Sequence, residues 1–236
     1  MIAVIVPAHD EAAVIGRCLA AIARAAAHPG LEGEPVAVIV ALDACTDETA
    51  VLCHAAGAIT VAVEARCVGA ARAAAADRAV ALGARWIAST DADTLVPADW
   101  LHMQLACGAD AFCGVVDVVD WLDYPAAVRE AFSCREVARD GHRHVHGANL
   151  GFSAAAYRVA GGFADLSTGE DVALVQTMQD RRVSIAWHAR PVVATSARRS
   201  ARAPAGFSGF LRALEREVMD AGERLRGARP VLDPLP

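Results

Sequence analysis

The sequence predicts an α/β protein that forms a single domain around a mostly parallel sheet flanked by helices. The prediction rests first on the order of the segments, because short β-branched runs alternate with longer alanine-rich segments of helical spacing. It rests second on continuity, because no linker, internal repeat or low-complexity segment separates them. A chain of 236 residues and 24.5 kDa is also long enough to enclose one core.

The first half of the chain gives the clearest alternation. Its predicted strands are the β-branched runs at residues 2–6, 36–42, 59–63 and 86–90. Its predicted helices are the segments between those runs, at residues 11–27, 47–56 and 69–83. In the first helix Val14, Cys18 and Ile22 recur every four residues, and Thr46 or Asp47 can cap the second. This order builds a parallel sheet, whose ligands gather beyond the carboxyl ends of its strands.

The second half of the chain does not continue this regular alternation of strands and helices. Its predicted helices cover residues 97–108, 124–139, 154–160 and 171–181, and its predicted strands cover residues 111–119, 183–187 and 192–195. A dense polar stretch at 141–149 precedes the third of these helices. A closing helix at 206–226 is amphipathic, with Phe207, Phe210 and Leu214 on one side. The single domain 1–236 thus divides into residues 1–95, residues 96–205, and a C-terminal amphipathic helix and tail at residues 206–236.

Composition and charge exclude several classes of protein. The net charge of −6 and the pI near 5.7 argue against a protein that holds nucleic acid by its phosphates. Mean hydropathy is +0.33, yet no run approaches the ~18 apolar residues of a membrane span, and the first residues lack the basic segment of a signal peptide. The last helix mixes arginines with acidic residues, which favours core packing or a homodimer contact over a lipid surface.

The cysteines indicate a reducing compartment. There are seven, an odd number, and no two are spaced as Cys-x-x-Cys. Most lie in alanine- and valine-rich stretches, where a thiol packs as a small apolar group. We therefore expect a cytoplasmic protein with neither a disulfide framework nor a zinc site.

Acidic residues follow three of the four strands in the first half. Glu11 comes after the first strand, Asp43 after the second, and Asp91 and Asp93 after the fourth. One such residue can be a helix cap, but acidic strand ends at one edge of a sheet repel one another unless a cation or a ligand donor lies among them. Oxygen ligands suit a hard divalent cation, and Asp91-Ala92-Asp93 can hold one together with a diphosphate.

Seven short motifs occur in order along the chain. They are Pro7-Ala8-x-x-Glu11, Asp43-Ala44-Cys45-Thr46-Asp47, Gly69-Ala70-Ala71-Arg72, Asp91-Ala92-Asp93, Gly147-Ala148-Asn149, Gly161-Gly162-Phe163 and Gly169-Glu170-Asp171. Together they resemble a family 2 glycosyltransferase of the GT-A fold over about residues 2–200. Two positions depart from the family's pattern: Asp10 stands where Asn is commoner, and Leu42 replaces the first of two frequent acids.

The resemblance implies a role for each matching residue. It implies that residues 1–95 bind the nucleotide and that residues 96–205 bind the acceptor and carry catalysis. The residues implied for the nucleotide are Pro7, Ala8, Glu11, Asp43, Arg72, Asp91 and Ala92, with Glu11 and Asp43 on the nucleoside. Asp93 would hold a divalent cation, Mn²⁺ or Mg²⁺, and Asp171 would be the general base. The residues implied for the acceptor and the donor sugar are His146, Gly147, Asn149 and Glu170.

Asp171 also has a chemical argument of its own. Displacement of a nucleoside diphosphate with inversion needs a base on the face opposite the leaving group. A carboxylate at a helix N-terminus stays ionised, because the helix dipole and the N–H groups of the first turn favour its charge. The alternative is that Glu170 and Asp171 only cap their helix. The other motifs favour the base.

Two further groups of polar residues are candidates for ligand contacts. Asn149 is the single Asn of the chain, and its amide can bond sugar hydroxyls or, alternatively, occupy a left-handed turn. His142, His144 and His146 alternate, which predicts one shared face of a strand or loop, solvated or lining the acceptor site, rather than a zinc site.

Three arginines follow the last predicted strand: Arg198, Arg199 and Arg202. Guanidinium groups suit a diphosphate, and the family often carries a basic motif here; the alternative is a solvated loop, because Arg is the only basic residue type apart from His in this chain. Some relatives place a metal-binding His nearby, where this chain has Ser196 and Ala197.

The leading functional prediction is a metal-dependent, inverting transfer of a sugar from a nucleotide-diphosphate sugar to a hydroxyl acceptor, which could be a small molecule, a glycan or a lipid-linked compound. One alternative is a retaining glycosyltransferase. A second is a sugar-1-phosphate nucleotidyltransferase, which would need a Gly-rich phosphate loop after the first strand, where residues 7–12 contain no Gly. A third is a catalytically silent sugar-nucleotide-binding module, which loss of Asp93 or Asp171 would indicate; both are present. The sequence does not identify the sugar, the base or the acceptor.

Overall fold

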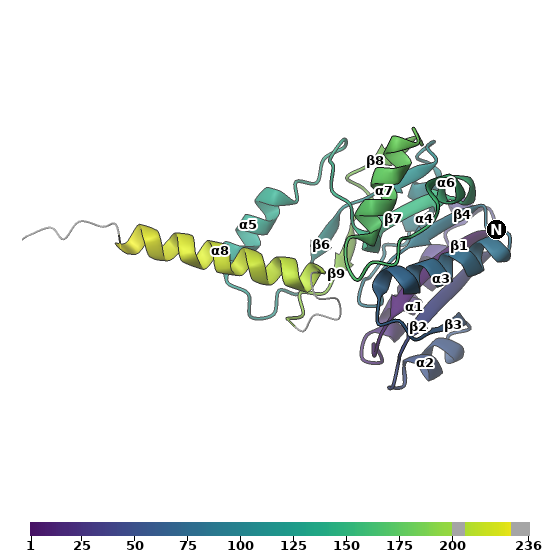
Figure 1. Ribbon diagram of the computed structural model, residues 1–236, viewed down its shortest axis with the longest axis horizontal. Coiled ribbons are helices and arrows are strands. Elements are labelled where there is room, and N and C mark those ends of the chain that lie inside the picture. Colours follow the sequence, from purple (N-terminus) through teal and green to yellow (C-terminus); the bar gives the residue numbers. More distant parts are fainter. Residues whose placement is uncertain (200–205, 228–236) are drawn as a thin grey trace, which may run out of the picture.

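The strands lie in one large sheet and one small sheet. The computed structural model describes residues 1–199 and 206–227, with side chains described as far as residue 221. Its strands are β1 (Ile2–Ala8), β2 (Val36–Asp43), β3 (Ile59–Val63), β4 (Trp86–Ser89), β5 (Ala111–Cys113), β6 (Val116–Val118), β7 (Leu150–Ser153), β8 (Ile185–Trp187) and β9 (Val193–Thr195). The large sheet has seven strands in the order β3-β2-β1-β4-β7-β5-β8, and β6 and β9 form the small one (Figure 1).

Helices cover both faces of the large sheet. They are α1 (Ile15–Ala26), α2 (Thr49–Ala55), α3 (Val68–Ala81), α4 (Trp100–Leu105), α5 (Ala126–Arg135), α6 (Ala154–Ala160), α7 (Glu170–Asp180) and α8 (Phe207–Gly227), with short 3₁₀ turns η1 (Pro29–Leu31) and η2 (Gly147–Asn149). Residues Ile2, Val4 and Val6 of β1 pack with α1, α2 and α4, while Ala3 and Ile5 pack with α3, α6 and α7. A strand buried on both faces reads as a continuous apolar run, as β1 does. The predicted α/β domain with helices on a mostly parallel sheet is confirmed.

The first half of the chain forms the parallel part of the sheet. Strand β1 pairs in parallel with β2 and β4, and β2 pairs in parallel with β3. The carboxyl ends of these strands therefore lie at one edge, which places the residues after β1, β2 and β4 together.

The second half differs from the sequence prediction in two places. Strand β7 was not predicted, because Leu150-Gly151-Phe152-Ser153 is short and contains a glycine, yet it runs antiparallel between β4 and β5. The single strand predicted over residues 111–119 is wrong: the chain leaves the large sheet after β5 and resumes in the small sheet as β6. At this break the Gly114 N–H donates to the Asn149 carbonyl.

Helices α5 and α8 pack on each other, and α8 extends away from the large sheet (Figure 1). Phe132 of α5 makes edge contacts with Phe207 and Phe210 of α8, with ring centroids 6.0 and 6.4 Å apart. Leu211 and Leu214 of α8 are buried in the same cluster, which confirms the predicted amphipathic helix. In the described part of the chain, none of the helices combines the length and the apolar character needed to cross a bilayer.

Candidate active site

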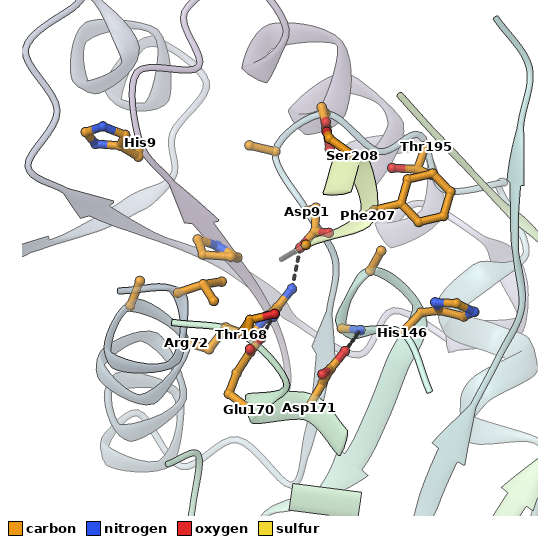
Figure 2. A pocket seen from close by; sticks show the side chains of 18 of the residues that line it. His9, Arg72, Asp91, His146, Thr168, Glu170, Asp171, Thr195, Phe207 and Ser208 are labelled. Carbon is orange, nitrogen blue, oxygen red and sulfur yellow. Dashed lines mark hydrogen bonds and ion pairs between the residues drawn. The ribbon is translucent and has the colours of Figure 1, made fainter. Parts of the chain in front are cut away.

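A cleft of about 530 Å³ opens at the carboxyl ends of β1, β2 and β4 (Figure 2). It gathers most of the residues that the sequence singled out: Pro7, Ala8, Glu11, Asp43, Arg72, Asp91, Ala92, Asp93, His146, Gly147, Glu170, Asp171 and Arg198. The other walls come from the start of α3, the start of α7, the end of β9 and the first turn of α8. Both halves of the chain therefore contribute to one cavity.

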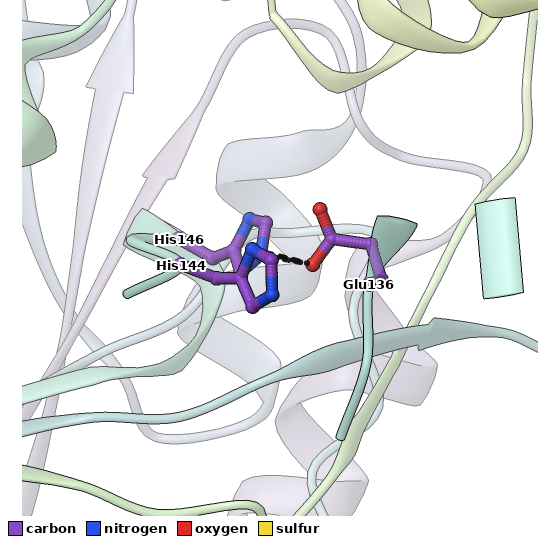
Figure 3. A group of neighbouring side chains, drawn as sticks. All are labelled: Glu136, His144 and His146. Carbon is purple, nitrogen blue, oxygen red and sulfur yellow. Dashed lines mark hydrogen bonds and ion pairs between the residues drawn. The ribbon is translucent and has the colours of Figure 1, made fainter. Parts of the chain in front are cut away.

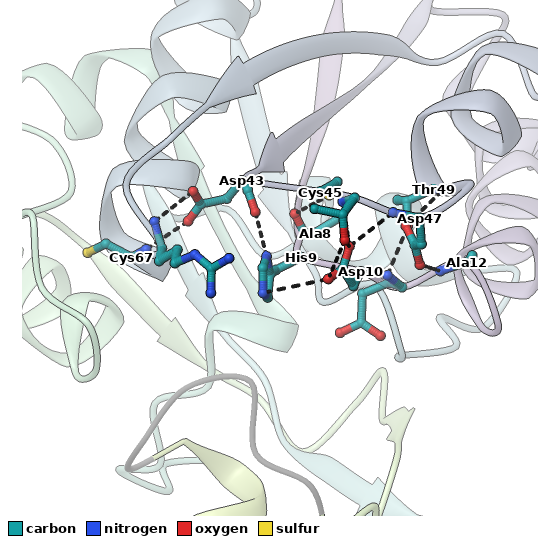
Figure 4. A network of polar contacts seen from close by, with 12 residues as sticks. Ala8, His9, Asp10, Ala12, Asp43, Cys45, Asp47, Thr49 and Cys67 are labelled. Carbon is teal, nitrogen blue, oxygen red and sulfur yellow. Dashed lines mark hydrogen bonds and ion pairs between the residues drawn. The ribbon is translucent and has the colours of Figure 1, made fainter.

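Asp43, at the end of β2, is held by backbone N–H groups (Figure 4). Its Oδ1 accepts from the N–H groups of Ala65 and Arg66 at 2.9 and 2.8 Å, and its Oδ2 accepts from that of Cys67 at 2.7 Å. These bonds fix the loop that leads into α3. A carboxylate offers about four acceptor positions, so one position on Oδ2 is left for a ligand.

Asp10 locks the loop after β1 to the loop after β2 (Figure 4). Its Oδ1 accepts from the N–H groups of Thr46 and Asp47 at 2.7 and 3.2 Å. The Thr46 bond is the largest cause of a lowered Asp10 pKa, so the carboxylate is ionised at neutral pH. Asp10 has a φ of 51°, a left-handed conformation that Asp and Asn tolerate better than most residues.

Glu11, Arg198 and Asp93 form a chain of charges in the cleft. Arg198 donates to both carboxylate oxygens of Glu11 at 2.5 and 2.6 Å, and its Nε lies 3.3 Å from Asp93 Oδ2. Burial raises the pKa of Asp93 to about 6; Arg198 opposes this rise, and the charges of Asp91 and Glu11 add to it. The arginine thus supplies part of the positive charge that this carboxylate cluster needs.

Arg72 of α3 lies between Asp91 and Glu170 and so links the two halves of the site (Figure 2). Its guanidinium donates to Asp91 after β4 and to Glu170 at the start of α7. Arg72 and Glu170 are buried, so these charges satisfy each other inside the protein. Gly147 lies against the same group, because a Cβ on Gly147 would meet the guanidinium carbon at 2.4 Å. Arg72 is therefore buried against Gly147 and also lines the cleft.

Asp171 lies in the first turn of α7 and lines the cleft (Figure 2). Its Oδ2 accepts from the Gly147 N–H at 2.6 Å, and its Oδ1 accepts from the Val172 N–H at 2.8 Å. Both bonds fix the orientation of the carboxylate. Each oxygen keeps a further lone pair, so the group can still accept a proton.

Two of the predicted residues that the structure describes, Asn149 and Arg199, do not line the cleft. Asn149 is fully buried and uses its whole amide: Nδ2 donates to the Val115 and Pro191 carbonyls, and Oδ1 accepts from Trp100. It organises the junction of η2 and β7 instead of facing a sugar. Arg199 does not line the cleft either. Arg202 lies outside the described residues.

Arg199 points to α8 instead. It bonds Asp123 at 2.7 Å and Glu215 at 2.6 and 2.9 Å, and its guanidinium lies 4.1 Å from the Tyr124 ring centroid. Adjacent arginines therefore have different surroundings, Arg198 in the cleft and Arg199 between loop 120–124 and α8.

The sequence analysis missed several residues that line the cleft. Glu136, Thr195, Phe207 and Phe210 face it. Glu136 follows α5 and bonds His146 Nε2 at 3.1 Å, a contact between residues ten positions apart that no local pattern predicts. The phenylalanines were recognised as one apolar helix face, but their place at the cleft depends on how α8 packs.

The fold is that of the GT-A glycosyltransferases, as the similar solved structures show. TarS from S. aureus, in complex with UDP-GlcNAc, superposes with a TM-score of 0.66 at 14% identity over 92% of this chain; the chain spans 66% of that structure, just under two thirds. A mannosyltransferase from Pyrobaculum calidifontis, in complex with GDP-Man and Mn²⁺, gives 0.60 at 18% identity over 98% of this chain and 76% of that one. Glucosyl-3-phosphoglycerate synthase from Mycobacterium tuberculosis, with Mn²⁺, UDP and glucosyl-3-phosphoglycerate, gives 0.59 at 20% identity over 100% and 83%.

The sequence match agrees with the fold. Residues 3–159, more than half of the chain, match the family model described as Glycosyl transferase family 2. The chain therefore belongs to glycosyl transferase family 2, as its motifs predicted. No protein with a curated description matches the sequence.

Proposed function

We propose that this protein transfers a sugar from a nucleotide-diphosphate sugar to a hydroxyl acceptor, with inversion and with the help of a divalent cation. One observation carries the proposal: the carboxylate of Asp171 and the carboxylate of Asp93 line the same cleft, from opposite halves of the chain. One can serve the acceptor while the other serves the leaving group.

The donor half fits a cation and a nucleotide. Asp93 is largely buried among Asp91, Glu11 and Arg198, and burial raises its pKa to about 6, so a cation would stabilise its ionised form. Carboxylate oxygens suit Mg²⁺ or Mn²⁺, so Asp93 would hold the ion. When bound, such an ion stabilises the charge that develops on a diphosphate leaving group.

The chain's own residues would hold the rest of the donor. The remaining acceptor position of Asp43 suits a ring N–H of a nucleobase. Pro7, Ala8 and Ala92 line the same cleft and would contact the nucleotide. Arg198, held by Glu11, would bind the diphosphate, so Glu11 would act through this arginine and not only on the nucleoside. Arg72 would keep Asp91 in place beside the ribose.

The acceptor half supplies the proton acceptor. Asp171 would remove the proton of the acceptor hydroxyl as the oxygen attacks the sugar carbon and the diphosphate leaves, and the Gly147 N–H would keep the carboxylate oriented. His146, on the same wall, is placed to contact the acceptor or the donor sugar. Glu170, which is buried against Arg72, would support Asp171 without touching substrate.

Relatives in fold act on this class of donor. The TarS structure holds UDP-GlcNAc, and the mannosyltransferase structure holds GDP-Man with Mn²⁺. These ligands support a nucleotide-sugar donor and a divalent cation for the present chain, without identifying its sugar, its base or its acceptor.

The experiment is a panel of UDP-, GDP- and dTDP-sugars incubated with the protein and Mn²⁺ in buffer containing methanol. Methanol is a small hydroxyl acceptor, and a methyl glycoside keeps the configuration in which it forms. We expect release of nucleoside diphosphate that stops with chelator, and a methyl glycoside of inverted configuration by NMR. A retained configuration would contradict the inverting mechanism, and turnover in chelator would contradict the role of the cation.

A further inference from the structure

Glu136, His144 and His146 bring a carboxylate and two imidazoles together beside the cleft (Figure 3). Glu136 Oε2 lies 3.1 Å from His146 Nε2 and 3.4 Å from His144 Nδ1. Each of the three residues offers one ligand atom, and these ligand atoms all lie within 4.8 Å of one another. In residues 1–199 and 206–221, whose side chains the structure describes, this is the one group of three His, Cys, Asp or Glu side chains with such spacing.

We propose that these three residues form a second cation site, separate from Asp93, that takes a transition metal of the zinc class. Tetrahedral zinc holds its nitrogen and oxygen ligands at about 2.0–2.2 Å, so neighbouring ligand atoms lie about 3.4 Å apart. The two distances to Glu136 are already close to that value. Three protein ligands leave a fourth position for water, as in many zinc sites that are open to a cavity.

The ligand chemistry separates this site from the one at Asp93. The carboxylates of Asp93, Asp91 and Glu11 offer only oxygen ligands, which suit Mg²⁺ or Mn²⁺. Two imidazoles and one carboxylate suit zinc or cobalt instead, and such sites bind both more tightly than Mn²⁺. Both rings can bind as neutral imidazoles, with the N–H proton on the nitrogen that faces away from the metal.

The rings are held in position before any metal arrives. His142, His144 and His146 stack in a row, with centroids 5.4 and 6.2 Å apart and planes within 20° of parallel. The shared face predicted from their alternation is therefore present, and the proposal assigns it to a metal, whereas the sequence pattern favoured solvent or the acceptor over zinc. His142 anchors the row, because its Nε2 lies 3.1 Å from the His188 carbonyl and its Nδ1 accepts from the His144 N–H. The ligand side chains are also sheltered, from 10% exposed at Glu136 to 28% at His144.

A metal here would tie the two ends of a loop together. Glu136 follows the last residue of α5, and His146 immediately precedes Gly147, whose N–H holds Asp171. The bound cation would thus fix the segment that orients the catalytic base. This consequence rests on the proposed function, but the metal site itself does not.

The first test measures metal binding without any turnover. The purified protein is titrated with Co²⁺, whose visible absorption reports its coordination, and then with Zn²⁺ as competitor. We expect one tetrahedral Co²⁺ that Zn²⁺ displaces. Glu136→Gln and His146→Gln should each weaken Zn²⁺ binding by at least the 10–100-fold that loss of an outer partner of a metal ligand costs.

Two variants control for other sites. Asp93→Asn should keep the tetrahedral Co²⁺ signal, since its carboxylate belongs to the other cation. The double variant His28→Gln/His102→Gln should keep it too, because that pair of stacked imidazoles, 4.9 Å apart, belongs to no three-residue group. If the wild-type protein binds no Co²⁺, or if Asp93→Asn loses the signal while Glu136→Gln keeps it, the proposal is overturned.

A second readout follows the loop itself. Arg139 and Arg143 lie between Glu136 and His144, so trypsin can report how often this segment opens. Zn²⁺ should slow cleavage at these arginines in the wild-type protein and in Asp93→Asn, but not in His144→Gln. Equal protection by Zn²⁺ in His144→Gln would show that the ion acts elsewhere and would overturn the assignment. Thermal unfolding without metal verifies that each variant is folded.

Discussion

Asp93 is a carboxylate whose ionisation the fold opposes. Burial raises its pKa to about 6 from the usual 3.8, so between these values the folded chain holds a proton that the unfolded chain has lost. Stability without metal therefore decreases as pH rises through this window, and the cost is complete above about pH 6. A cation bound by the ionised group would remove the cost, so metal and proton compete for the same oxygens.

This competition predicts how Mn²⁺ affinity depends on pH. Affinity should be level above about pH 7 and fall about tenfold per unit below the pKa of Asp93, since one proton must leave for the metal to bind. Calorimetric or EPR titration with Mn²⁺ measures it, on Glu136→Gln so that only one cation site is present. Asp93→Asn in the same background should show no such site. Affinity that stays constant down to about pH 5 would contradict the assignment.

The adjacent arginines give a matched pair of variants. Arg198 lies in the cleft against Glu11 and Asp93, whereas Arg199 bonds Asp123 and Glu215 outside it. Arg198→Gln should weaken nucleoside diphosphate binding by roughly 10–150-fold, the usual worth of a hydrogen bond between charged groups. Arg199→Gln should leave it unchanged. Calorimetry with UDP and GDP in the presence of Mn²⁺ compares the two variants. Equal losses of nucleotide affinity would contradict the assignment of Arg198, and not Arg199, to the diphosphate.

At the scale of elements, Arg72 is the link between α3, β4 and α7. A single guanidinium donates to both Asp91 after β4 and the buried Glu170 of α7. The motif Gly69-Ala70-Ala71-Arg72 has a packing reason as well, because a Cβ on Gly69 would meet the Ala164 carbonyl oxygen at 2.2 Å. Glycine thus lets the start of α3 approach the loop before α7, and this approach brings Arg72 within reach of Glu170.

Removing this link should destabilise the protein. Arg72→Met leaves Glu170 buried without a partner, and breaking a buried pair in this way costs about 3–5 kcal/mol of unfolding free energy. Urea denaturation measures the loss. Arg78→Met on the same helix is the control, because Arg78 is exposed and should have little effect. If the two variants unfold alike, Arg72 is not the structural link described here.

Elements with strong local signals could be predicted from the sequence, and elements defined by tertiary contacts could not. The continuous apolar run of β1 and the apolar face of α8 are local patterns. Strand β7 has four residues and a glycine, and it is a strand because β4 and β5 pair with it on both sides. The run 111–119 looks like one strand because the pattern does not show that the two halves join different sheets.

At the scale of the whole molecule, the cleft forms where strand ends and helix starts from both halves of the chain come together. The acidic residues after β1, β2 and β4 were predictable, since parallel strands place their carboxyl ends together. Their pairing was not: the sequence does not show that Glu11 binds Arg198, 187 residues away, or that Asn149 turns inward to Trp100 and two carbonyls. Such contacts depend on how the second half folds over the first.

The most direct test of the account is the turnover of Asp171→Asn. The amide keeps the shape of the carboxylate and can still accept from the Gly147 N–H, so the fold and the donor affinity should be preserved. As a general base, Asp171 is worth roughly 10²–10⁴ in kcat.

The measurement is kcat for nucleoside diphosphate release in the presence of acceptor and Mn²⁺, with Asp165→Asn as an exposed control from the loop before α7. The account predicts a loss of roughly 10²–10⁴ for Asp171→Asn, unchanged donor Kd, and near-normal kcat for Asp165→Asn. Near-normal kcat for Asp171→Asn would contradict it, because a residue that only caps α7 is replaced by Asn without loss.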